Sequence, residues 1–109
     1  MKYYAVAEID VTDPSWVQDY IDKVTAMVER RGGRYLARTA RIEKREGDRM
    51  PPQIVLIVEW PSKAAADQFY ASDEYRPFLQ ERLSGARSEL ILVAGEDLND
   101  AGEDRLNRL

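Results

Sequence analysis

Hydrophobic and polar positions follow two different periods in the first part of the chain. Residues 2–11 alternate and are rich in aromatic and β-branched side chains, which predicts a β-strand. Thr12-Asp13-Pro14 then offers a capping residue and a proline for the first turn of a helix. Large apolar side chains recur at helical spacing from Trp16 to Val28, and Gly32-Gly33 ends this helix.

The remainder of the chain predicts two strands, an interrupted helix and a last strand. Residues 34–46 indicate a long strand, and the turn-forming residues after it lead to 53–60, an apolar run typical of a central strand. A second helix begins at Pro61-Ser62. It must break before Pro77, because an interior proline destabilises a helix by about 3 kcal/mol. Residues 86–94 form the last strand.

The order β-α-β-β-α-β predicts an α+β, ferredoxin-like domain over residues 1–95, followed by an acidic, polar tail over 96–109. We expect the first and third strands to lie parallel in the middle of a four-stranded sheet, with both helices on one face. The other face would expose Val6, Val55 and Ile57. A two-fold homodimer would cover these side chains and enclose a cavity between two sheets.

The amino-acid composition excludes several kinds of catalytic and metal-binding site. The 109 residues include no Cys and no His, which excludes disulfides, Cys/His zinc sites, thiol nucleophiles and imidazole bases. No apolar run approaches the roughly 20 residues of a membrane span. Residues 30–49 are basic, but the net charge of −4 disfavours nucleic acid as a partner. No metal or nucleotide motif occurs, so we expect no cofactor and no metal, and we expect a cytoplasmic location.

The chain resembles the bacterial family called domain of unknown function 1330, within the dimeric α/β-barrel superfamily. The resemblance spans residues 1 to about 95 and rests on the order and spacing of AEIDVTDP (7–14), Gly32-Gly33-Arg34-Tyr35-Leu36, Arg38, Glu46-Gly47, Val58-Glu59-Trp60-Pro61-Ser62, Ala66, Phe69-Tyr70, Ser72 and Glu74-Tyr75. The chain departs from the family pattern at Thr39-Ala40, where two glycines are common, and at Trp16, where tyrosine is more usual. The resemblance implies a dimeric barrel and no established reaction. Cofactor-free oxygenases, decarboxylases and isomerases share the wider superfamily.

Two carboxylates stand out on otherwise apolar strands. Glu8 and Glu59 share the parity of the helix-free face, so we expect both to point into the cavity. If they lie close together, one pKa rises and suits acid–base catalysis. Alternatively, each carboxylate pairs with an arginine and fixes the geometry of the dimer.

Arginines and tyrosines supply the remaining candidate groups. Arg38 is predicted on the strand beside Glu59, where it holds a substrate carboxylate or neutralises Glu59. Arg82 could converge from the rim of the cavity, or pair structurally. Tyr20, Tyr70 and Tyr75 could donate hydrogen bonds to a substrate, or pack in the core.

These groups favour a small-molecule site for an anionic or aromatic ligand. If the protein is an enzyme, proton transfer or oxygenation of a small organic acid fits them, with Glu59 and Glu8 as acid–base groups, Tyr75 as donor and Arg38 as anchor. The first alternative is a non-catalytic dimeric interaction module whose cavity is filled by its own side chains. A second alternative is contact with anions or nucleic acid through residues 30–49.

Overall fold

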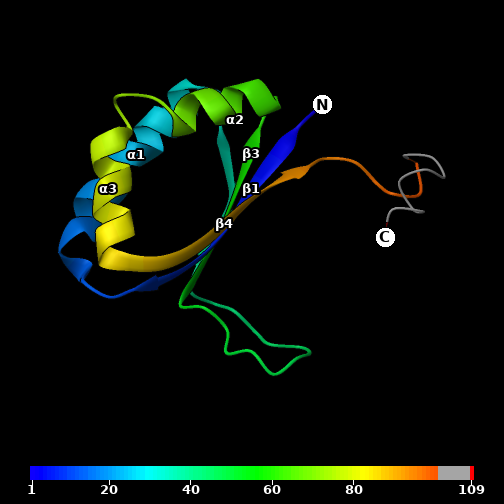
Figure 1. Ribbon diagram of the computed structural model, residues 1–109, viewed down its shortest axis with the longest axis horizontal. Coiled ribbons are helices and arrows are strands. Elements are labelled where there is room, and N and C mark those ends of the chain that lie inside the picture. Colours follow the sequence, from blue (N-terminus) through cyan, green and yellow to red (C-terminus); the bar gives the residue numbers. More distant parts are fainter. Residues whose placement is uncertain (101–108) are drawn as a thin grey trace.

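A computed structural model describes residues 1–100 and 109 of the chain. One antiparallel sheet carries three helices on one side, and a long loop and the residues that follow the last strand, up to residue 100, project away from them (Figure 1). The elements in chain order are β1 (Tyr3–Val11), a 3-10 turn η1 (Pro14–Trp16), α1 (Val17–Arg30), β2 (Arg34–Thr39), β3 (Ile54–Trp60), α2 (Lys63–Tyr70), α3 (Arg76–Gly85) and β4 (Ala86–Ala94). The α+β, ferredoxin-like prediction is confirmed.

The strand order is β2-β3-β1-β4, with β1 and β3 in the middle as predicted. The prediction that these two strands run parallel was wrong, because Tyr3 lies opposite Trp60 and Ile9 opposite Ile54 in an antiparallel register. The connections explain this. The α1 crossover returns the chain so that β2 runs in the direction of β1, and the β2–β3 hairpin then reverses it.

The predicted strand 34–46 ends early, at Thr39. Its ladder with β3 finishes at the pair Thr39 and Val55, so the residues that follow have no strand to pair with. The backbone N–H of Arg41 donates to Thr39 Oγ1 at 2.9 Å, which turns the chain away from the sheet. Residues 40–53 therefore form a long loop.

Local sequence chemistry explains both ends of the helices. Asp13 accepts a hydrogen bond from the Ser15 N–H and starts the turn before α1, and Gly32, with a φ of 91°, stands just after that helix ends. Ser62 caps α2 by accepting from the Ala65 N–H. The predicted break before Pro77 is confirmed, because that proline occupies the first turn of the separate helix α3.

The hydrophobic core lies between the helices and one face of the sheet. Its main cluster comprises Val24, Met27, Val28, Val58, Trp60, Ala66, Phe69 and Tyr75. The strand residues in and against this cluster are odd-numbered in β1 and even-numbered in β3. Val6, Val55 and Ile57 therefore lie on the helix-free face, as predicted, where each is partly buried.

The segment predicted as a tail, 96–109, lies in part outside the described residues, which exclude 101–108. Within the described part, the Asn99 N–H donates to the Asp97 carboxylate at 2.8 Å and closes a short turn. None of the helices in the described part is long and apolar enough to cross a membrane.

Candidate functional site

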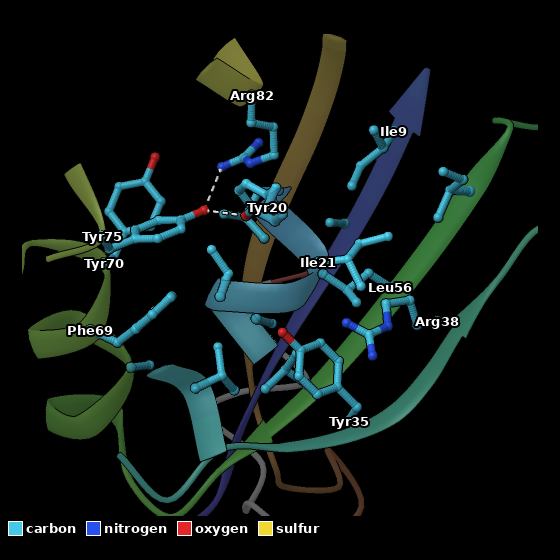
Figure 2. A pocket seen from close by; sticks show the side chains of 18 of the residues that line it. Ile9, Tyr20, Ile21, Tyr35, Arg38, Leu56, Phe69, Tyr70, Tyr75 and Arg82 are labelled. Atoms are coloured by element: carbon cyan, nitrogen blue, oxygen red, sulfur yellow. Dashed lines mark hydrogen bonds between the residues drawn. The ribbon is translucent and has the colours of Figure 1, made fainter. Parts of the chain in front are cut away.

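A pocket of about 420 Å³ opens between the helices and the sheet (Figure 2). Its floor is formed by apolar strand side chains such as Ala5, Ala7 and Leu56. Helix residues, among them Tyr20 and Arg82, form the opposite wall. The cavity was predicted between the sheets of two subunits. This pocket is a different one, because it lies on the helix side, within one chain.

Three polar groups meet at one end of the pocket (Figure 2). The hydroxyl oxygens of Tyr20 and Tyr75 lie 2.6 Å apart, and Arg82 Nη2 donates to Tyr75 Oη at 3.5 Å. Tyr75 is only 3% exposed and Arg82 only 4%. We call these three residues the Tyr-Tyr-Arg cluster. Three of the predicted site residues are thus brought together.

Helices α1 and α3 position the three side chains of this cluster. Tyr75 directly precedes α3 and Arg82 follows it by seven residues, close to two full turns, so both side chains leave the helix on one face. Tyr20 reaches them from α1. Its ring packs edge-on against the rings of Trp16 and Tyr75, with ring centres 5.2 Å and 6.1 Å away. The Phe69 ring also packs against the Tyr75 ring, and the two ring centres are 4.4 Å apart. The two hydroxyls are therefore held by ring packing.

Burial governs the protonation of the cluster. It raises the pKa of the Tyr20 hydroxyl far above its usual value, and the nearby Tyr75 hydroxyl adds to the increase. Burial acts to lower the pKa of Arg82, but its interactions with Tyr75 and Tyr20 outweigh this and raise the pKa overall. Tyr20 is therefore a neutral donor at physiological pH, and Arg82 is a cation.

The Arg82 charge has no carboxylate partner within 4 Å among the residues that the structure describes. Asp67 is the one acidic side chain among the residues lining the pocket, and its carboxylate is already bound by Lys63 Nζ at 2.7 Å. A guanidinium that is almost fully buried ordinarily needs an opposite charge. The cluster therefore carries an uncompensated positive charge.

Arg38 and Tyr35 line a different part of the pocket (Figure 2). The Arg38 guanidinium lies 4.2 Å from the centre of the Tyr35 ring and donates to Thr25 Oγ1 at 2.8 Å. The strand of Arg38 lies beside the strand of Glu59, as predicted. The suggestion that Arg38 neutralises Glu59 was wrong, because Arg38 lies opposite Leu56 in the ladder, Arg34 lies opposite Glu59, and Glu59 pairs with Lys2.

Tyr35 was missed as a site residue for a physical reason. Residues three apart on a regular strand point to opposite faces, so Tyr35 and Arg38 should not meet. A β-bulge between Tyr35 and Ala37 adds one residue, which brings both side chains to the helix side. No residue type in this segment signals the bulge. Tyr70, which was predicted, also lines the pocket, at its exposed edge.

Glu8 and Glu59 do not form the predicted carboxylate pair. Glu59 lies opposite Tyr4, and Glu8 lies opposite Val55, so four residues of antiparallel ladder, roughly 13 Å, separate them. Both point away from the helices, as predicted, and hence away from the pocket. Glu59 pairs with Lys2 at 3.1 Å and Glu8 with Arg49 at 3.0 Å. Only Glu8 has an arginine partner of the kind proposed in the structural alternative.

In the described part of the chain, no group of three or more Asp and Glu side chains is placed to hold a metal ion. The pocket instead offers neutral hydroxyls, a cation and apolar walls. Such a site can bind and orient an apolar molecule that carries a negatively charged or polar oxygen.

Comparison with known proteins shows the family. The profile of the family described as domain of unknown function (DUF1330) matches residues 2–96, and the chain belongs to this family. No protein among those of curated function matches the sequence significantly.

Several solved structures share the fold. The RPA0582 protein of unknown function from Rhodopseudomonas palustris is 17% identical, with a TM-score of 0.72 over 88% of this chain and 83% of that chain. SnoaB, a cofactor-independent oxygenase from Streptomyces nogalater, is 18% identical, with a TM-score of 0.63 over 88% and 94% of the two chains. An antibiotic biosynthesis monooxygenase is 15% identical, with a TM-score of 0.58 over 89% and 100%. At these identities the likeness concerns the fold alone.

Proposed function

We propose that this protein binds a small, largely apolar organic molecule in the helix-side pocket, and that it does so as a homodimer. The observation that carries the proposal is an open volume of about 420 Å³ with apolar walls and a few converging polar groups at one end. Ligand sites typically have this composition.

Filling the pocket tests the binding function. Ala5 lies on the pocket floor, and Ala5→Phe would place a ring in the open volume. Ala64→Phe is the matched control, because Ala64 is exposed on α2 and is not among the lining residues. We expect the neutral fluorescent dye Nile red to bind wild type and the control equally, and to bind Ala5→Phe at least tenfold more weakly. Equal binding to all three proteins, or no binding, contradicts the proposal.

The homodimer is supported by an exposed apolar run on β4. Residues 90–93 are Leu-Ile-Leu-Val, and they are 39%, 60%, 37% and 41% exposed. Ile91 and Val93 pair with Val6 and Tyr4, so they extend the apolar helix-free face to the edge of the sheet. An apolar edge strand of this kind invites another strand or sheet. A second copy of the chain offers the same surface, related by a two-fold axis.

Light scattering tests this assembly. Two 12.5 kDa subunits are expected in the wild-type particle. We expect Ile91→Glu to yield monomers, because the new charge would be buried in the interface. Leu83→Glu is the control, because Leu83 is 54% exposed on α3. A monomeric wild type, or an Ile91→Glu variant that stays dimeric, contradicts the assembly.

Oxygenation without a cofactor is a second candidate function, favoured by the buried Tyr-Tyr-Arg cluster. Hydrogen-bond donors and a cation in an apolar site stabilise an enolate oxygen, the form in which a carbon acid gives electrons to dioxygen. In the balanced reaction a substrate CH2 group and one O2 give C=O and one water. The test is protein-dependent oxygen uptake with an enolisable aryl ketone such as 2-tetralone. Uptake that is unchanged by Tyr75→Phe contradicts a role for the cluster.

A further inference from the structure

We propose that the pocket recognises an organic carboxylate, and that Arg82, not Arg38, is its anchor. This inference rests on the proposed binding function and adds the chemical class of the ligand. Its starting point is the buried Arg82 guanidinium, which is 4% exposed and lines the open pocket.

The hydrogen-bond inventory of Arg82 leaves most of its donors unused. A guanidinium carries five N–H donors. In the described part of the chain, its partners are neutral hydroxyls: Tyr75 Oη, through a long 3.5 Å hydrogen bond, and the Tyr20 hydroxyl, whose interaction with Arg82 is smaller. Folding would ordinarily not retain a buried cation with so little compensation. A bound anion supplies both the missing charge and the missing acceptors.

The tyrosine pair adds a donor directed at the same place. Tyr20 and Tyr75 share one hydrogen across their 2.6 Å contact, and either hydroxyl can be its donor. In both arrangements the second phenolic hydrogen is not used within the pair. The cluster therefore presents guanidinium N–H groups and one O–H group, and it presents no carboxylate. Two donor types converging from one side match the two oxygens of a planar carboxylate.

Arg38 meets the requirements of an anchor less well. Its guanidinium is exposed, stacks on the Tyr35 ring and already donates to Thr25. Water compensates an exposed charge, so an anion gains little there. The apolar floor between the two arginines fixes the remainder of the ligand, which we infer to be a flat or compact hydrocarbon body. An aromatic carboxylate has this shape.

The test compares a carboxylate with its neutral isostere. We would measure the binding of 2-naphthoate and 2-naphthamide to the wild-type protein by calorimetry and by displacement of Nile red. Wild type should prefer the carboxylate about tenfold, which corresponds to about 1.4 kcal/mol, because a hydrogen bond between two charged groups is stronger than a hydrogen bond to a neutral amide. Arg82→Met should lose the preference and still bind Nile red.

Arg76→Met is the matched control. Arg76 lies on the same helix, is exposed and pairs with Asp73 at the surface, so its removal should leave the preference unchanged. If Arg82→Met does not fold, Arg82→Gln removes the charge and keeps a donor for Tyr75. Equal affinity for carboxylate and amide, or a preference retained without Arg82, overturns the carboxylate assignment. Neither outcome contradicts the proposed binding function of the pocket. Failure of Nile red to bind wild type overturns the binding function together with the carboxylate assignment.

Discussion

Removing the Tyr75 hydroxyl should destabilise the protein more than removing its partner hydroxyl on Tyr20. Tyr75 Oη is the shared atom of the cluster, in contact with Tyr20 at 2.6 Å and with Arg82 at 3.5 Å. Tyr75→Phe therefore leaves a buried phenol and a buried cation without this partner. Tyr20→Phe leaves Tyr75 still bonded to Arg82. Both substitutions remove a phenolic oxygen, and they differ in which polar groups lose a hydrogen-bond partner.

The geometry sets the expected magnitudes. An unsatisfied buried polar group costs about 1–3 kcal/mol, and the 3.5 Å contact adds little, so Tyr75→Phe should cost about 2–3 kcal/mol. Tyr20→Phe loses one hydrogen bond, worth about 0.5–1.5 kcal/mol. The double variant should cost less than the sum by about 1 kcal/mol, because the hydroxyl that Tyr75→Phe strands is already gone.

Urea denaturation followed by circular dichroism measures these differences. All four proteins must be compared at one protein concentration, because dissociation of a dimer would shift the midpoint. The reasoning is refuted if Tyr20→Phe costs as much as Tyr75→Phe. It is equally refuted if the two losses add to within about 0.5 kcal/mol, since groups that do not interact behave in this way.

Two further predictions follow from other groups. Glu59→Gln should change the stability by less than about 1 kcal/mol and leave Nile red binding intact, because Glu59 lies outside the pocket and its partner Lys2 is 59% exposed; a loss of 3 kcal/mol in a urea melt contradicts this. Tyr20 should stay protonated in an absorbance titration of the folded protein past pH 11. Its raised folded pKa means that stability falls as pH rises above about 10, the usual tyrosine value, so its titration in the native state near pH 10 would contradict the burial argument.

The secondary structure could be predicted because its signals are local. The proline before α3 and the glycines after α1 act within a few residues, so the break in the second helical segment and the end of the first helix were confirmed. The end of β2 could not be predicted in this way. Its sequence continues to alternate past Thr39, but a strand needs a partner, and β3 supplies none beyond Val55.

For the candidate site, too, local features could be predicted and tertiary contacts could not. Tyr20 and Tyr75 were candidates because they are amphipathic aromatic residues at helix faces or ends, and Arg82 because it could reach the cavity from its rim. Their contact depends on how α1 and α3 pack, which no local pattern encodes. The predicted proximity of Glu8 and Glu59 assumed parallel central strands. Reversing one strand keeps the face of each residue and moves the residue to the other end of the ladder. The alternation along each strand predicts which face of the sheet a side chain occupies. It does not predict which side chains of two strands lie close together.

The two faces of the sheet therefore have different roles. Its helix side contributes an apolar floor, and the polar groups of the pocket come mainly from helices, so the chemistry at the buried end of the pocket is carried by α1 and α3. Its other side holds the charged residues Glu8 and Glu59 among apolar ones, each with a basic partner from outside the sheet. In the proposed dimer this side faces a second copy, where ion pairs that stay solvated can help to set the register of two otherwise apolar surfaces while they add little to stability. The two strand carboxylates, which first suggested catalysis, are then better explained as determinants of assembly.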